Sequence, residues 1–411
     1  MSLSPYQSSL VKLWNFISKN KHRENKYALS VFEEIIKDIE RKSGNDAWKQ
    51  GQHIEAMSRL LESINDTRDL HSFGRFYVKS FFTELLSQRQ ALEGLWLQNP
   101  RISNDERITK PVIILGLPRS GTSFVFNLLA QDPSHRFLSN WETTVSQIPP
   151  EKHCNYLQDP RRKKGKLLVK FQDYLAPSLK NIHEFHLDGP EECTPILMQG
   201  FSTQAFAGMF DAPEYSTWLN TVSQDENYQH HKKVLQTLQW KYPGQRWLLK
   251  SPDHLAGIDS ILKTYPDACF IHLHRDPVQS VTSWASLNQV FRSIYMKSVD
   301  PKILGEQVLG RLGNDMDNYI LHRKKYKPEQ FFDLYYQDLI HNPIKSIEEI
   351  YQHFSLDFSV VVSQKMREFL AKDRKKTRSH QYSAEDFSLN SGLISERFNN
   401  YIDTFNVPIV K

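Results

Sequence analysis

Three short apolar runs, each followed by a turn and a helical pattern, constrain the fold more than any other feature of this sequence. They cover residues 111–116, 246–250 and 269–274, and residues 331–336 make a plausible fourth. Their β-branched and large apolar side chains are typical of strands buried on both faces. Strand and helix in alternation predict an α/β fold, with helices on both faces of a parallel sheet. Ligands of such sheets bind beyond the carboxyl ends of the strands.

The predicted α/β domain covers residues 106–411, and a helical region precedes it over residues 1–105. The apolar residues that recur there at helical spacing include Leu10, Leu13, Trp14, Ile17, Val31, Ile35 and Ile39. Residues 99–110 have the composition of a linker. About 130 residues separate the first two predicted strands, far more than a βαβ crossover requires. We expect this insertion, at about residues 145–240, to form the acceptor side of a site.

The insertion holds an apolar, phenylalanine-rich stretch at residues 198–210. Such a stretch either lines a pocket for an apolar ligand or packs in the core. Core packing is the more common outcome for a stretch of this kind. The stretch nevertheless favours a hydrophobic acceptor over a polar one.

Charge and cysteine content exclude several classes of protein. The 411 residues include 52 Lys and Arg against 47 Asp and Glu, a net charge of +5, which is too small to indicate a nucleic-acid-binding surface. No apolar run approaches the 18 residues of a membrane span, and the first residues do not resemble a secretory signal. The widely spaced Cys154, Cys193 and Cys269 fit a reducing compartment. We expect a cytoplasmic protein; the sequence does not indicate its oligomeric state.

An anion-binding loop is predicted at Gly116-Leu-Pro-Arg-Ser-Gly-Thr-Ser123, between the first strand and a helix. Backbone N–H groups and a helix N-terminus would surround an anion there. The glycine spacing is that of a Walker A loop, but Thr122 stands where that motif requires lysine, which argues against a nucleoside triphosphate. Arg119 would supply the charge by forking two oxygens of a phosphate or sulfate. The candidate hydroxyl donors are Ser120, Thr122 and Ser123.

This loop resembles the one with which sulfotransferases bind the 5′-phosphosulfate of 3′-phosphoadenosine 5′-phosphosulfate (PAPS). Arg275, at the end of a predicted strand, and Ser283, eight residues later, resemble the pair that binds the nucleotide 3′-phosphate in that family. Lys250-Ser-Pro-Asp-His-Leu resembles the Lys-x-Pro segment of bacterial and tyrosylprotein sulfotransferases, and Tyr336-Gln-Asp-Leu resembles the family's Tyr-x-Asp-Leu segment. The resemblance covers about residues 111–343.

The resemblance implies a P-loop-like three-layer α/β/α core that binds PAPS without needing a metal. The residues it assigns to the donor are Arg119, Ser120, Gly121, Thr122, Ser123, Arg275, Ser283 and Tyr336. The C-terminal nucleotide loop of the cytosolic enzymes is absent from this sequence. Candidates to close over the adenosine in its place are Arg374, Lys376, His380 and Tyr382.

The implied reaction moves a sulfuryl group to a hydroxyl of a hydrophobic small molecule. Arg119 would hold the sulfate and the 5′-phosphate, and Lys250 would neutralise the leaving oxygen. The acceptor must also lose a proton to a nearby base. Cytosolic relatives place a histidine two residues after this lysine, where Pro252 stands here.

Four residues are candidates for the general base. Glu142, in a Glu-Thr pair that resembles the catalytic position of tyrosylprotein sulfotransferases, is the first choice. His254 is the second, and His183 or His186 follows. The structural alternatives are that Glu142 caps a helix or lies on the surface, and that His254 positions the Lys250 turn.

Other functions fit the sequence less well. A kinase-like phosphotransferase would need a loop lysine and a magnesium carboxylate, and neither can be assigned. A non-catalytic nucleotide-binding protein would have no need for Lys250 or Glu142. The segment from His183 to His186 is one residue short of a His-Glu-x-x-His zinc motif, and no Gly-x-Ser-x-Gly segment indicates a hydrolase.

Overall fold

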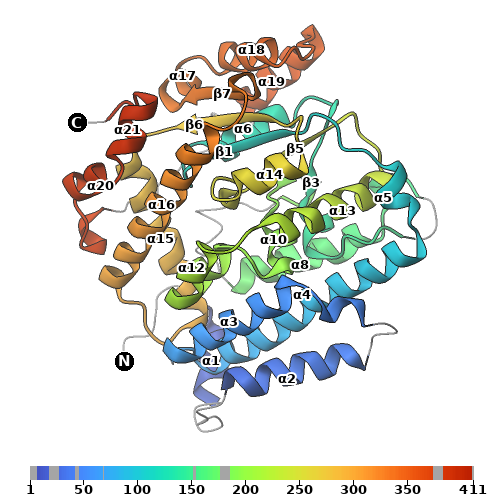
Figure 1. Ribbon diagram of the computed structural model, residues 1–411, viewed down its shortest axis with the longest axis vertical. Coiled ribbons are helices and arrows are strands. Elements are labelled where there is room, and N and C mark those ends of the chain that lie inside the picture. Colours follow the sequence, from blue (N-terminus) through green and yellow to red (C-terminus); the bar gives the residue numbers. More distant parts are fainter. Residues whose placement is uncertain are drawn as a thin grey trace.

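A parallel sheet of five strands lies at the centre of the α/β domain (Figure 1). The structure, a computed structural model, describes residues 7–17, 27–41, 46–67, 69–150, 154–175, 186–373 and 383–409. The strand order is β2-β5-β1-β6-β7. The strands are β1 (Val112–Gly116), β2 (His135–Arg136), β5 (Arg246–Lys250), β6 (Cys269–His274) and β7 (Phe331–Tyr335). All four predicted strands are therefore confirmed, to within one residue at each end.

Both faces of the sheet are buried, which explains why its strands are apolar throughout. Ile113 and Leu115 of β1 belong to one core, and Val112 and Ile114 belong to another on the opposite face. The helices that contribute to the first core include α13 (Asp225–Lys241), α14 (Ile258–Thr264), α15 (Pro277–Tyr295), α16 (Pro301–Arg323), α20 (Ser391–Arg397) and α21 (Asn399–Phe405). Those of the second core include α6 (Thr122–Leu129), α17 (Tyr336–His341), α18 (Pro343–His353) and α19 (Val360–Asp373). The predicted three-layer arrangement is confirmed.

The register of the strands brings the predicted motifs to one edge of the sheet. Ile114 pairs with Lys250, and Gly116 pairs with Leu273. His274 pairs with Tyr335. Because the strands are parallel, the segments that follow β1, β5, β6 and β7 all leave the sheet on the same side.

Helices of the N-terminal region pack at the opposite end of the molecule from α17 and α18 (Figure 1). They are α1 (Ser9–Ile17), α2 (Tyr27–Glu40), α3 (Gln52–Thr67) and α4 (Ser72–Gln98). A fifth helix, α5 (Arg101–Asp105), lies beside α13 instead. The periodic residues Val31, Ile35 and Ile39 are buried, as their spacing predicts. The stripe on α1 is different, because Leu13 and Ile17 are exposed. Helix α5 occupies part of the predicted linker.

The insertion between α6 and β5 is mostly helical. Its elements include α7 (Asn140–Thr144), α8 (Arg161–Leu175), α10 (Thr194–Leu197), α11 (Ala205–Met209) and α12 (Pro213–Leu219). Two short strands, β3 (Leu138–Ser139) and β4 (Pro190–Glu191), pair antiparallel. The apolar stretch 198–210 contributes Phe201, Phe206 and Phe210 to a core shared with α3 and α4. Packing, rather than a ligand pocket, accounts for its composition.

Within the described residues, no helix is both long enough and apolar enough to cross a membrane. Cys154, Cys193 and Cys269 are all described and none of them forms a disulfide.

Candidate active site

The loop after β1 has the backbone of an anion-binding turn. Gly116, Arg119 and Gly121 adopt positive φ angles of 145°, 67° and 100°. A Cβ atom on Gly116 would lie 2.8 Å from the carbonyl oxygen of Leu273, so the close approach of β1 and β6 requires glycine there. Helix α6 begins at Thr122, and the first N–H groups of a helix have no partners within it. The loop and this helix end together favour a negatively charged ligand.

The hydroxyl groups of this loop lie in two environments. Ser120 is fully buried, and its Oγ has no hydrogen-bond partner among the described residues. A buried polar atom without a hydrogen-bond partner destabilises the fold unless a ligand or a water molecule forms that hydrogen bond. Ser123 points to β5, because its Oγ accepts a hydrogen bond of 3.1 Å from Lys250 Nζ. Lys250 is 5% exposed and forms an ion pair with Glu192.

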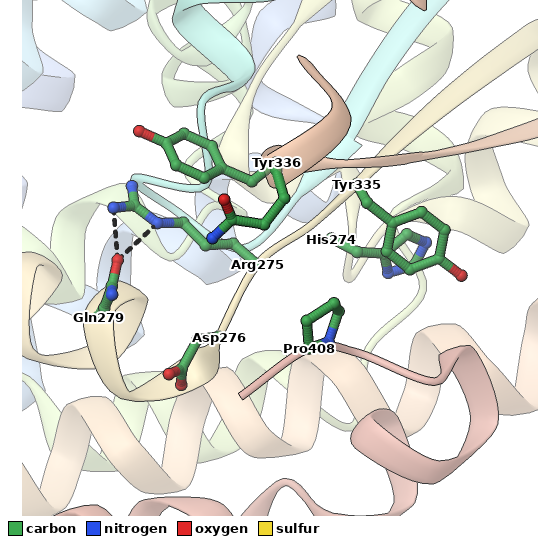
Figure 2. Close-up of a pocket in the computed structure, with 8 residues that line it drawn as sticks. His274, Arg275, Asp276, Gln279, Tyr335, Tyr336 and Pro408 are labelled. Carbon is green, nitrogen blue, oxygen red and sulfur yellow. Dashed lines mark hydrogen bonds between the residues drawn. The ribbon is translucent and has the colours of Figure 1, made fainter. Parts of the chain in front are cut away.

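Arg275 follows β6 and is attached to the loop. Its Nη1 donates to the backbone carbonyl of Arg119 at 2.8 Å, and its Nε and Nη2 donate to Gln279 Oε1 at 2.9 and 2.5 Å. The guanidinium lies 4.0 Å from the centre of the Tyr336 ring, a cation–π contact. Figure 2 shows Arg275, Gln279 and Tyr336 beside a small pocket. The residues that line it are His274, Arg275, Asp276, Gln279, Tyr335, Tyr336, Gln337 and Pro408.

Ser283 and Tyr336 also lie against the loop. Arg119 Nε donates to Ser283 Oγ at 3.2 Å. The Tyr336 ring lies 3.1 Å from the position that a Cβ atom of Gly121 would take. The structure therefore brings Arg119, Arg275 and Ser283 together, although 156 residues separate the two arginines. In this structure Ser283 contacts Arg119 rather than Arg275.

Glu142 has the surroundings of a structural carboxylate. It is fully buried, and Arg136 binds its two oxygens at 3.0 and 2.5 Å. It also accepts hydrogen bonds from the backbone N–H of Ser139 and from the Tyr156 hydroxyl. With Ser139 it completes a capping box at the start of α7. This is the capping role that the sequence offers as the alternative to catalysis.

His254 lies in a short 3₁₀ turn, Pro252–His254, directly after β5. It is 1% exposed, and its Nδ1 contacts the Tyr228 hydroxyl at 2.9 Å. Burial lowers the pKa of His254 well below its usual value, so the imidazole is neutral. The contact to Tyr228 agrees with the alternative in which His254 holds the turn that carries Lys250.

Glu192 is the candidate that sequence reasoning missed. It follows β4, where Pro190 and Glu191 pair with Ser139 and Leu138. Its Oε1 pairs with Lys250 Nζ, and its Oε2 accepts a hydrogen bond of 3.2 Å from Thr194. The only sequence signal was the acidic turn at residues 188–193, which carries no motif.

Several predicted residues lie outside the described residues. They are His183, Arg374, Lys376, His380 and Tyr382. His186, the other histidine of that candidate pair, is described and exposed.

A histidine and carboxylate cluster lies beneath Arg275 and was not predicted. The ligating atoms of His272, His274 and Asp333 lie within 4.8 Å of one another. Arg323 binds both oxygens of Asp333, each at 2.6 Å. The guanidinium therefore already neutralises the carboxylate, which disfavours a cation at this position.

Known proteins are similar to the part of the chain that forms this edge of the sheet. A model described as the sulfotransferase family matches residues 111–360, more than half of the chain. The omega-hydroxy-beta-dihydromenaquinone-9 sulfotransferase Stf3 of Mycobacterium bovis is 25% identical over 372 residues, which are 86% of this chain and 90% of that protein.

Two solved structures share most of the fold. Sulfotransferase STF1 from Mycobacterium tuberculosis H37Rv superimposes with a TM-score of 0.79 at 25% identity, over 90% of this chain and 98% of that one. Sulfotransferase STF9 from Mycobacterium avium gives a TM-score of 0.80 at 25% identity, over 92% and 97%. The similarity therefore extends beyond the α/β core into the N-terminal helices.

Proposed function

Because this chain belongs to the sulfotransferase family and is a sulfotransferase, we propose that it transfers the sulfuryl group of PAPS to a hydroxyl of a hydrophobic small molecule. One observation carries the choice of donor. Arg119 after β1, Lys250 at the end of β5 and Arg275 after β6 lie around one glycine-containing loop at the carboxyl edge of the sheet. A donor with phosphate groups at both ends of an adenosine suits two separate guanidinium groups.

The residues of the loop fit the phosphosulfate end of this donor. The unpartnered hydroxyl of Ser120 and the N-terminus of α6 offer hydrogen bonds to an anion. The guanidinium of Arg119 adds two parallel N–H donors and a positive charge at the same turn. When bound, PAPS supplies the sulfuryl group that is transferred. We assign the 3′-phosphate to Arg275, which Gln279 and Tyr336 hold, and to Ser283, which contacts Arg119.

Lys250 is the residue we assign to the charge that develops on the leaving oxygen. It is almost fully buried, so its charge acts through little solvent. Ser123 and Glu192 hold its Nζ at the mouth of the loop. A positioned cation of this kind costs no reorganisation during the reaction.

Glu192 is the general base that the geometry supports best. A base needs an oxygen that can reach the acceptor hydroxyl. Glu142 is fully buried and Arg136 binds both of its oxygens, whereas the side chain of Glu192 is 20% exposed beside Lys250. Thr194 orients the second oxygen of Glu192. Glu142 and His254 are the alternative candidates for this role.

The acceptor is assigned from a relative rather than from the Phe-rich stretch, which lies in the core. Stf3 is named for a hydroxylated menaquinone, a hydrophobic molecule with a terminal hydroxyl. We propose an acceptor of the same class, an apolar molecule that ends in an alcohol. A cytoplasmic location and activity without a divalent metal remain predictions.

Ligand titration tests the donor. We expect 3′-phosphoadenosine 5′-phosphate (PAP) to bind at least about a hundredfold more tightly than ATP, since each charged hydrogen bond contributes about 1.5–3 kcal/mol. Tighter binding of ATP would favour the kinase alternative. Binding of PAP without any transfer of labelled sulfate to a panel of apolar alcohols would favour a non-catalytic role.

A further inference from the structure

Helix α8 presents an apolar stripe outward. Leu167, Phe171 and Tyr174 are 68%, 52% and 55% exposed. Their spacing of four and three residues places them on one side of the helix. Few globular surfaces expose two aromatic residues and a leucine in one row, so this stripe calls for a partner.

Lysines flank this stripe on the same outward side. Lys163, Lys166 and Lys170 border one edge of it and Lys164 borders the other, at 100° per residue. All four lysines are exposed. Their long aliphatic stems allow the ammonium groups to extend past apolar neighbours. Apolar residues between lysines are the pattern of a helix that lies in the interface of an anionic membrane.

The inner side of α8 packs against the segment that carries Glu192. A Cβ atom on Gly165 would lie 2.7 Å from Cβ of Trp141, so the helix lies directly on α7. The Arg161 guanidinium lies 4.9 Å from the Trp141 ring centre. Arg162 forms an ion pair of 2.6 Å with Asp188, four residues before Glu192. The outward stripe therefore belongs to the acceptor side of the enzyme.

We propose that α8 docks this enzyme on the surface of an anionic phospholipid membrane. The stripe of Leu167, Phe171 and Tyr174 enters the headgroup region, and the four lysines contact lipid phosphates. Charge complementarity decides between possible occupants, since a second copy of this chain would bring a second set of the same lysines to the contact. The link to catalysis rests on the proposed function, because an apolar alcohol dissolved in a membrane would reach the site from this side.

Vesicle sedimentation tests the docking without any measurement of activity. The intact protein is mixed with vesicles of phosphatidylglycerol and phosphatidylcholine in equal parts, or with vesicles of phosphatidylcholine alone. We expect binding to the anionic vesicles only, and weaker binding at high salt. The triple variant Leu167→Ser, Phe171→Ser, Tyr174→Ser and the variant Lys163→Glu, Lys170→Glu should each lower the partition coefficient at least about tenfold.

Two matched controls identify the surface. Val360→Ser with Val361→Ser removes exposed apolar side chains, 86% and 62% exposed, from α19 and should leave binding unchanged. Phe16→Ser with Ile17→Ser does the same on α1, where both side chains are 71% exposed. Loss of binding in the α1 variant but not in the α8 variants would overturn the proposal.

Two further outcomes would also overturn it. One is equal binding to both kinds of vesicle. The other is a dimer in light scattering that the α8 variants convert to a monomer, with no binding to vesicles. Circular dichroism checks that each variant is folded. Because vesicle binding and sulfate transfer are measured separately, failure of the docking proposal leaves the proposed reaction intact.

Discussion

Glu142 and Glu192 differ in how far their side chains are buried. Glu142 is enclosed by an arginine, a tyrosine and a backbone N–H group, so its charge is used to hold α7 in place. Glu192 shares a buried ammonium with Ser123 and keeps part of its side chain in contact with solvent. The two carboxylates therefore differ in burial, since Glu142 is fully buried and the side chain of Glu192 is 20% exposed.

Replacement of Lys250 by alanine tests its role at the leaving oxygen. We expect turnover to fall on the order of 100- to 1000-fold, the loss typical of one positioned group that stabilises transition-state charge. Affinity for PAP should fall less than about tenfold, because Arg119 and Arg275 remain. Steady-state kinetics and calorimetry measure the two effects. Equal losses in turnover and in PAP affinity would instead assign Lys250 to binding.

Matched glutamine variants separate Glu192 from Glu142. Glu192→Gln should lower turnover about 100-fold or more, since it removes the base. It should also lower the free energy of unfolding, because the buried Lys250 ammonium loses its counter-charge. Glu142→Gln should cost about 3–5 kcal/mol of stability, because it leaves the Arg136 guanidinium buried without its counter-charge. Its turnover per folded molecule should stay near normal. Low turnover in Glu142→Gln with near-normal turnover in Glu192→Gln would instead assign the general base to Glu142.

At the scale of elements, the site depends on where strands end and what the next turn allows. Parallel pairing brings the ends of β1, β5 and β6 together, and the register decides that Lys250 lies beside β1. The loop after β1 then requires glycine at two positions of positive φ. A turn that is strained for other residues becomes the place where backbone N–H groups face a ligand.

Alanine at Gly116 tests this requirement. The new Cβ atom would meet the Leu273 carbonyl at 2.8 Å in a backbone conformation that alanine disfavours. We expect a loss of about 1–3 kcal/mol in stability and at least about tenfold weaker binding of PAP. Gly310→Ala is the control, since a Cβ atom there meets nothing within 4 Å and α16 should gain about 0.5–1 kcal/mol. Unchanged PAP binding in Gly116→Ala would contradict the loop assignment.

At the scale of the whole molecule, the N-terminal helices and the α/β domain are not separated by a flexible connection. Leu287, Val290 and Ile294 of α15 belong to the same core as α2, α3 and α4. Backbone hydrogen bonds join His71 to Tyr295 and Lys297 to Asp69 across this contact. We therefore expect the chain to unfold as one cooperative unit.

Buried neutral histidines should make this unit sensitive to acid. Burial lowers the pKa of His71 to about 4 and that of His231 to about 3. The other described histidines whose pKa values burial lowers are His135, His230, His254, His272 and His274. Below pH 6.5 these histidines bind protons in the unfolded chain but stay neutral in the folded one. Their full contribution to the free energy of unfolding is therefore present above pH 6.5 and is lost as the pH falls below it.

Urea unfolding at pH 7.5, 6.0 and 5.0 measures this effect. The free energy of unfolding should fall with pH by more than the roughly 1.4 kcal/mol per pH unit that one such group contributes. His231→Gln should lower that slope by about the contribution of one group, whatever its effect on stability at neutral pH. A free energy that does not change between pH 7.5 and 5.0 would contradict the assignment of buried, neutral imidazoles.

The sequence by itself determined four of the five strands of the central sheet, the loop after Gly116 and the placement of Arg119, Lys250 and Arg275 at strand ends, because these are properties of local pattern and spacing. Only the tertiary structure decided which carboxylate accompanies the lysine. Glu192 lies 58 residues before Lys250, and no local pattern predicts that the segment after β4 lies beside the end of β5. Burial likewise decided that Phe201 and Phe206 pack in the core while Leu167 and Phe171 face outward, because exposure depends on what other segments cover.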